Sequence, residues 1–549
     1  MSANKNAGAI AGALIAGVLT LSTGAHAQGV APVAVEETSI ARDAFSTGIL
    51  GADAGGFGSD LWAGASAAEL ERLLVLTPSR PASPAMGRLL QRLLLTTAPG
   101  PQGAPASLGG RKLLALARVG RYDDARTIAS LSSAAQDDQW VNQALAVADL
   151  LDADLSGACS REDRVNAGRD ALFWVKLRVL CYASEDQFDS ADLTLGVLRE
   201  QGSLSDADDA LLTAASIPAP LKKPVAPKTA LQLALLRRLS GATAAGYEGS
   251  ADGGVLLSIA RNEETDARTR LVAATHAAAI GAARAPTLKA LFAGVDAASD
   301  MTLADDDILI DAARFQRIAK MTSPEFLRDR ATLIAEAVRI APSFPRAYAA
   351  ALVYAEDVSA LEGVIVAPDE AAAFAIVSMA NGRPEAAARW LQGMLGQGLN
   401  TVNEKQALEF IDLVNLLGVL DGRQARIVAA AANVQIDPPR ARFSAADEID
   451  RERLGAIIAA GFGAASSNAR GQLALSAIAL TSPAFLGDPV ADRVAAAALT
   501  AAGLDDVRRR HEFETAWKAT FPDSEAVAVT ASAHDEDGGF APSLKPQNP

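Results

Sequence analysis

The two cysteines are the residues of this chain best placed to react with each other. Cys159 and Cys181 are the only cysteines among the 549 residues. A redox site normally uses a C-x-x-C pair, and a structural metal site needs more than two ligands. We therefore expect a structural disulfide, which forms in an oxidising compartment and is worth ~3 kcal/mol for a loop of this size. It would pin a polar loop containing Cys159 across a helix containing Cys181.

A calcium-like pattern overlaps the first cysteine. Oxygen-bearing side chains and one glycine occupy six positions of an EF-hand-type loop, in which alternate oxygens converge on a hard cation. These residues are Asp152, Asp154, Ser156, Gly157, Ser160 and Asp163. The last is Asp instead of the longer Glu that binds with both oxygens, and Cys159 stands where an apolar residue is usual. The pattern leaves calcium binding open, but it favours an acidic turn and helix terminus.

Signatures of catalysis are missing from the sequence after residue 27. The histidines there are His276, His511 and His534, and none belongs to an H-E-x-x-H motif, which argues against zinc hydrolysis. G-x-S-x-G, S-x-x-K and Walker motifs are also absent. We therefore expect no enzyme activity, cofactor or resident metal.

The two densest charged runs have structural interpretations. The acidic run Asp305–Asp307 precedes the apolar residues 308–310, where acids cap a helix and favour its macrodipole. The basic run Arg508–Arg510 follows Asp505 and Asp506, which lie four residues before two of the arginines. This spacing predicts ion pairs within one helix.

Composition predicts an all-α protein. Half of the residues are hydrophobic but only 5% are aromatic, and the excess is Ala and Leu, which are strong helix formers. Alternating runs of β-branched and aromatic residues, which would predict strands, are nearly absent. The formal net charge is −15. A surface this acidic repels phosphate backbones, so we exclude nucleic acid as a partner.

The first 27 residues have the features of a cleaved export signal. Lys5 precedes an apolar run over residues 7–19, and Ala25-His26-Ala27 provides the small residues that signal peptidase requires. We expect cleavage near Ala27, a mature chain beginning near Gln28 and a periplasmic location. No later stretch reaches the ~20 apolar residues of a membrane-spanning helix, so no integral membrane segment is expected after cleavage.

The rest of the chain divides by the positions of its glycines and prolines. Residues 28–60 have no sustained period and predict a flexible leader. Residues 61–530 have helical periodicity, with proline-rich breaks near residues 218–227 and 438–439. Residues 531–549 predict a disordered tail.

One turn pattern recurs three times. A small or polar residue closes a helix, an aromatic residue or proline follows two positions later, and Ala follows three positions after that. The copies are Gly120-Arg121-Tyr122-Asp123-Asp124-Ala125, Asp186-Gln187-Phe188-Asp189-Ser190-Ala191 and Gly382-Arg383-Pro384-Glu385-Ala386-Ala387. At these places the chain resembles the helix-turn-helix unit of tetratricopeptide repeats, whose period is ~34 residues. The resemblance implies an α-solenoid of degenerate helical hairpins.

A second resemblance is to uncharacterised exported alphaproteobacterial proteins with Ala-rich helical repeats. It rests on four short segments: Asp60-Leu61-Trp62, residues 69–74 (ELERLL), residues 88–95 (RLLQRLLL) and residues 173–181 (FWVKLRVLC). This resemblance implies one envelope protein from end to end.

These expectations predict a non-catalytic, periplasmic protein-binding scaffold whose partners are envelope proteins, because open repeat arrays present extended binding surfaces. The alternative is a cell-wall-associated enzyme or accessory factor of the superhelical lytic transglycosylase type, and a purely structural envelope protein is a third possibility. A deep polar pocket with convergent carboxylates would favour the enzyme.

Overall fold

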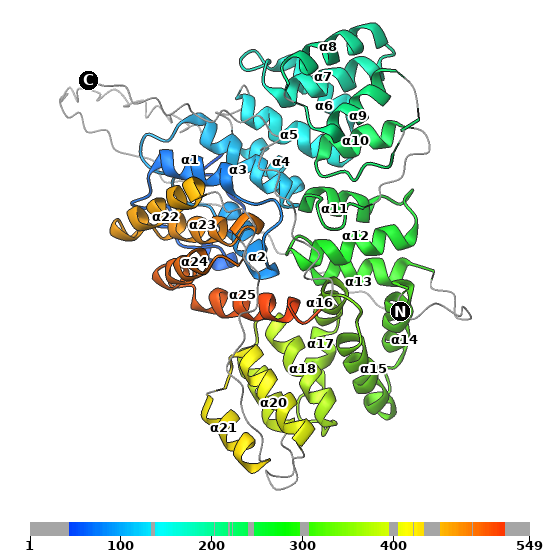
Figure 1. The fold of residues 1–549 in the computed structure, drawn as a ribbon, viewed down its shortest axis with the longest axis vertical. Helices are drawn as coiled ribbons and strands as arrows, with labels where there is room; N and C mark the ends of the chain where they lie inside the picture. The colour runs from blue at the N-terminus through cyan, green and yellow to red at the C-terminus, as the bar shows by residue number, and fades with distance from the viewer. Residues whose placement is uncertain are drawn as a thin grey trace, which may run out of the picture. The chain divides into compact units, whose positions relative to one another are not determined.

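The protein is all-helical wherever its structure is described. The computed structural model describes residues 43–132, 138–202, 204–217, 220–221, 223–239, 246–296, 307–394, 404–420, 422–432, 451–485 and 487–521. Within these ranges 25 α-helices follow one another, and the only β-type pairing is an isolated bridge between Leu50 and Thr96 (Figure 1). The predicted all-α class is confirmed. None of the helices found in these ranges combines the length and apolarity that crossing a membrane requires.

The helices of the first half are α1 (Ala67–Leu76), α2 (Pro84–Leu95), α3 (Ala106–Arg118), α4 (Tyr122–Leu131), α5 (Gln139–Leu151), α6 (Leu155–Arg164), α7 (Leu172–Ser184), α8 (Phe188–Glu200), α9 (Asp206–Ser216), α10 (Ala230–Arg238), α11 (Gly253–Arg261), α12 (Ala267–Ala279) and α13 (Ala285–Gly294). Those of the second half are α14 (Leu309–Lys320), α15 (Leu327–Arg339), α16 (Phe344–Val353), α17 (Ala355–Ala360), α18 (Pro368–Ala380), α19 (Pro384–Met394), α20 (Glu404–Leu417), α21 (Gly422–Ala431), α22 (Arg451–Ser466), α23 (Arg470–Leu480), α24 (Pro489–Ala501) and α25 (Asp505–Lys518).

All three predicted turns join the two helices of a hairpin. Gly120 lies between α3 and α4, Asp186 between α7 and α8, and Gly382 between α18 and α19, and all three have positive φ. In each turn the N–H of the next residue donates to a carbonyl five residues back, as in a Schellman helix end. These bonds join Arg121 to Leu116 at 2.8 Å, Gln187 to Tyr182 at 2.9 Å and Arg383 to Ser378 at 2.9 Å.

The alanine five positions after each of these turn residues is fully buried. Ala125, Ala191 and Ala387 lie in the first half of the second helix of their hairpins, and none is exposed to solvent. A methyl group at this position lets the two helices approach closely. The predicted helix register at these three places is therefore confirmed.

A further copy of the turn, missed in the sequence, lies between α5 and α6. Ala153 has a φ of 63°, Asp154 N donates to Asp149 O at 2.8 Å, and Ala158 is fully buried. Residues 120, 153 and 186 are thus equivalent and follow one another at intervals of 33 residues. Three consecutive helical hairpins, α3–α4, α5–α6 and α7–α8, share one repeat length.

Part of the predicted flexible leader packs into the core. Ala44, Phe45 and Phe57 are almost completely buried, and the Lys112 ammonium donates to the carbonyls of Phe45 and Thr47 at 2.7 and 2.6 Å. The hydrophobic residues of this segment have no helical or strand period, because the segment forms no α-helix or strand and packs against helices that are distant in the sequence. The prediction was therefore wrong for residues 43–60, and residues 28–42 lie outside the described ranges.

The helices near the C-terminus pack against those near the N-terminus. Gly471 N in α23 donates to Leu61 O at 2.9 Å, and Gln472 accepts at 2.9 Å from Ser66 N at the start of α1. α25 also contacts α2, α18 and α20. In a linear array each repeat contacts only its neighbours, so these long-range contacts are a departure from a simple stack.

A buried carboxylate holds α25 in this position. Glu514 has no exposed surface and accepts hydrogen bonds from Arg88 at 2.7 Å, Ala85 N at 2.6 Å and the Tyr348 hydroxyl at 3.1 Å. These partners belong to α2 and α16. Trp517, one turn further along α25, packs against Phe344 and Tyr348.

The predicted domain boundaries are covered only in part. None of the residues described between α9 and α10 is helical, and the break near residues 218–227 stays a prediction. The second break at residues 438–439, the export signal at residues 1–27 and the tail at residues 531–549 all lie outside the described ranges.

Candidate groove and the predicted site residues

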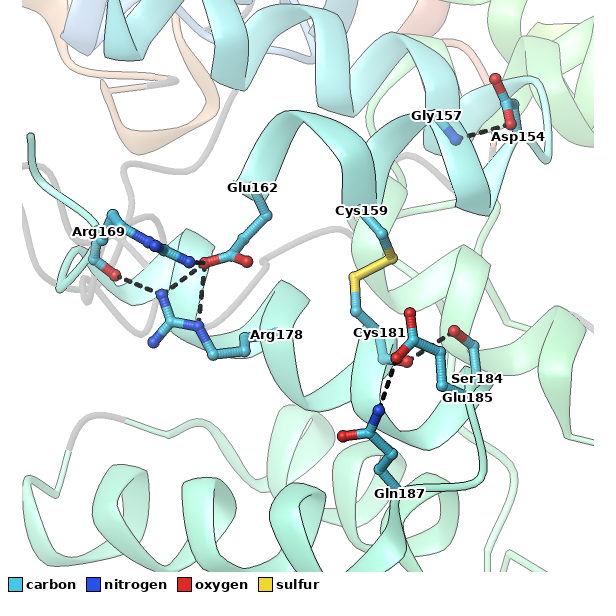
Figure 2. Close-up of a disulfide and its surroundings, with 10 residues drawn as sticks. All are labelled: Asp154, Gly157, Cys159, Glu162, Arg169, Arg178, Cys181, Ser184, Glu185 and Gln187. Carbon is cyan, nitrogen blue, oxygen red and sulfur yellow. Dashed lines mark hydrogen bonds and ion pairs between the residues drawn. A yellow bond between two sulfur atoms is a disulfide. The ribbon is translucent and has the colours of Figure 1, made fainter. Parts of the chain in front are cut away.

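The two cysteines form the predicted disulfide. Their Cα atoms are 5.8 Å apart, and Figure 2 shows the bond joining α6 to α7. Cys159 lies within α6, not in the polar loop that the sequence suggested. The bridge therefore links two packed helices of successive hairpins.

The calcium-like segment is a helix with its N-cap. The Asp154 side chain accepts from Gly157 N at 2.9 Å (Figure 2). Helix α6 then continues through Asp163, which is exposed. Side chains spaced along a helix point in different directions, so the five oxygen-bearing side chains of the pattern do not converge. Among the described residues no group of three or more His, Cys, Asp or Glu side chains is placed to hold a metal. The favoured interpretation, an acidic turn and helix terminus, matches this geometry.

The two histidines that lie in the described ranges are enclosed by the protein. Burial lowers the pKa of His276 in α12 and of His511 in α25 to about 4. His511 Nδ1 lies 2.9 Å from the Ser83 hydroxyl. His534 is outside the described ranges.

The charged runs also have structural roles. Asp307 accepts from Leu309 N at 2.9 Å at the start of α14, as expected for a helix terminus, whereas residues 305 and 306 are outside the described ranges. Arg508 pairs within α25 with Asp505 at 3.2 Å and Glu512 at 2.8 Å. Intrahelical pairing therefore occurs in this run, but through Arg508 and, at 3.6 Å, between Arg510 and Glu514, and not between Asp505 or Asp506 and the arginine four residues later, as the spacing predicted.

A groove along successive first helices of the hairpins is the candidate binding site, and sequence reasoning missed it. Two cavities of about 60 and 30 Å³ share Leu114, Arg118, Gln143 and Phe173 as lining residues. These residues come from α3, α5 and α7. The larger cavity also reaches α1, and the smaller one reaches α10. We call the two cavities and their lining residues the α3–α5–α7 groove.

The 33-residue repeat places equivalent residues along this groove. Trp140 in α5 corresponds to Phe173 in α7, and Gln143 corresponds to Lys176. Gly110 sets the spacing of the first two helices, because a Cβ atom there would collide with the Cβ of Trp140. The groove is therefore a product of the repeat geometry.

Each cationic side chain of the groove has a carboxylate partner. Arg111 Nε lies 2.9 Å from Glu71, and its guanidinium carbon is 4.0 Å from the centre of the Trp140 ring.

Deeper in the groove, Arg118 pairs with Asp252 at 3.1 Å. Lys176 pairs with Asp208 at 2.6 Å, and both side chains are almost completely buried. The charges of the groove are thus balanced within the protein.

Gln143 is the exception among the polar side chains of the groove. It lines both cavities and only 5% of its surface is exposed, but its amide hydrogen-bonds to no other described residue and keeps some contact with the open groove. Most buried amides in proteins are hydrogen-bonded. An unpaired amide facing a cavity is placed to bind a ligand.

The sequence signal for this groove was present but weak. The helix pattern around Gln143 is apolar on most sides, and nothing in it distinguishes a buried amide from a surface one. Aligning Trp140 with Phe173 requires the 33-residue spacing of residues 120, 153 and 186. This spacing was not recognised, because alanine at position 153 does not indicate a turn. In comparisons with known proteins, no family model, curated protein or solved structure matches this chain.

Proposed function

We propose that this protein is a non-catalytic, protein-binding scaffold of the periplasm, and that its α3–α5–α7 groove holds a segment of an envelope protein. The observation that carries the proposal is the alignment of three equivalent helical hairpins with one groove along their first helices. Repeated hairpins of this length resemble degenerate tetratricopeptide units, and solenoid surfaces of this type are suited to binding extended chains.

The N-terminal sequence supports the proposed periplasmic location. Lys5, the apolar residues 7–19 and the small residues ending at Ala27 have the pattern of a cleaved signal. The disulfide between Cys159 and Cys181 agrees with an oxidising compartment.

The two carboxylates of the groove, Asp208 and Asp252, are held by hydrogen bonds and ion pairs, which favours a binding role over the alternative of a cell-wall enzyme. Asp208 accepts from Lys176, from Gln232 Nε2 at 3.1 Å and from the Ser205 hydroxyl at 3.0 Å. Asp252 is held by Arg118 and the Ser79 hydroxyl. A pair of carboxylates for glycoside hydrolysis has to act on the bond between two sugars, and these two are occupied by the protein's own donors.

Site-specific photocrosslinking in the exporting cell tests the proposal. A photoreactive phenylalanine derivative at position 140 lies at the edge of the groove, and the same derivative at position 193 lies on the exposed outer surface of α8, where Leu193 is 74% exposed. We expect a discrete protein adduct from position 140 that is absent from position 193. Absence of any adduct at position 140, with the protein folded and exported, would contradict the proposal.

A further inference from the structure

We propose that the α3–α5–α7 groove selects an uncharged, extended peptide segment, whose main chain pairs with the Gln143 amide while one short aliphatic side chain enters the larger cavity. This inference rests on the proposed function and specifies the ligand of the same site. It follows from three properties of the groove: its unpaired amide, its balanced charges and its volume.

The unpaired amide matches a peptide bond. A glutamine side chain offers one carbonyl acceptor and two N–H donors, which complement the N–H and C=O of an extended main chain. Gln143 is 95% buried, lines both cavities and has no partner among the described residues. A ligand main chain would supply the missing hydrogen bonds.

The balanced charges exclude a charged side chain from the ligand at this point. The three cations that line the groove are already paired: Arg111 with Glu71, Arg118 with Asp252 and Lys176 with Asp208. A ligand carboxylate or ammonium placed here would lose its hydration and gain no free counter-charge, and an uncompensated buried charge is strongly unfavourable.

The volume and lining of the larger cavity fix the size of the side chain that enters it. A cavity of about 60 Å³ holds only a few water molecules, since one water needs ~10–15 Å³. Its lining includes the apolar side chains of Leu74, Leu114 and Val119. A short aliphatic side chain such as valine fits these limits better than a drug-sized molecule, which needs ~300 Å³ or more.

A sugar ring is a poorer match for the same surface. Sugar recognition commonly uses an open aromatic face, but Arg111 already lies over the ring of Trp140 at 4.0 Å. The guanidinium is held in place by Glu71, so this ring face is covered before any ligand arrives.

The test uses the full mature protein and fluorescently labelled synthetic peptide pools. Each pool consists of nonapeptides of Ser, Thr and Gly with one central residue, which is Val, Asp or Lys, and binding is followed by fluorescence anisotropy. We expect the Val pool to bind at least tenfold more tightly than the Asp and Lys pools. Chitooligosaccharides serve as the sugar probe and should not compete with the Val pool.

Two matched glutamine variants separate recognition from folding. Gln143→Leu should weaken binding of the Val pool at least tenfold without lowering the melting temperature, because the amide makes no hydrogen bond to any other described residue. Gln91→Leu is the control: Gln91 is at least as deeply buried, lines neither cavity of the groove, and its amide donates to Gly281 O at 2.9 Å. It should lower the melting temperature and leave the affinity for the Val pool within twofold.

The outcomes distinguish this inference from the proposed function. If crosslinks form at position 140 but Gln143→Leu binds peptides normally or has a lowered melting temperature, the ligand assignment is wrong while the scaffold role stands. Preference for the Asp or Lys pool, or competition by the oligosaccharide, would also overturn the assignment. Failure of all pools to bind, together with no crosslink at position 140, would overturn both.

Discussion

Replacing Glu514 by Gln tests whether the buried carboxylate network holds α25 against α2 and α16. The substitution keeps the size of the side chain and removes its charge, which leaves the Arg88 guanidinium without its counter-charge at 2.7 Å. Breaking a buried ion pair by removing one partner costs ~3–5 kcal/mol. Glu514 accepts with both oxygens, and the single amide oxygen of glutamine can replace only one of them. Because the Arg88 side chain is still 26% exposed, we nevertheless expect the lower end of that range, about 3 kcal/mol.

The control lies two residues away on the same helix. Glu512 pairs with Arg508 at 2.8 Å, but its side chain is 52% exposed. Exposed pairs of this kind contribute ~0.3–0.5 kcal/mol, so Glu512→Gln should change stability by less than 1 kcal/mol. Urea unfolding followed by far-ultraviolet circular dichroism measures both variants. Equal unfolding free energies for the two variants would refute the view that the Glu514 network anchors α25.

Two further predictions concern the histidines and the disulfide. Burial holds the pKa of His276 and His511 at about 4 in the folded protein, against 6.5 for an ordinary histidine. As the pH falls from 6.5 to 4, these histidines therefore bind protons in the unfolded chain but not in the folded protein, and the free energy of unfolding decreases. Between pH 7.5 and about 5, each histidine should lower the free energy of unfolding by about 2 kcal/mol, which urea unfolding at the two pH values measures. The double variant His276→Gln/His511→Gln should lose most of this pH dependence. Changing both Cys159 and Cys181 to Ser should lower the free energy of unfolding by ~3 kcal/mol. Dithiothreitol should destabilise the wild type by the same amount and have no further effect on the variant. If neither the double substitution nor reduction changes the melting temperature, the bridge has no structural role.

Local features of this fold were predictable from the sequence. The hairpin turns at residues 120, 186 and 382 were predictable because each depends on two residues only five positions apart. The first residue adopts positive φ in the turn, and the second is a small residue in the second helix that packs against the first helix. The same rule missed the turn at Ala153, which has positive φ without being glycine, asparagine or aspartate. Positive φ at such a residue is imposed by the helices on either side of it.

Features that depend on distant segments were not predictable. Phe45 and Phe57 have no periodic neighbours, so their burial could not be inferred from the leader sequence. Gln143 is also not recognisable as a site residue from its neighbours in α5. Its role depends on the approach of α3 and α7 from either side, and thus on where the cavities form.

The same long-range contacts determine the wall of the α3–α5–α7 groove. Leu74 and Val75 of α1 line the larger cavity, and α1 is held by α23 through the Gln472 amide and the packing of both helices. The C-terminal helices therefore support one side of a groove whose other sides are built from the repeats. Since α1 lines the larger cavity and packs on α23, the groove is a property of the N-terminal hairpins and the C-terminal helices together, and not of residues 106–200 alone.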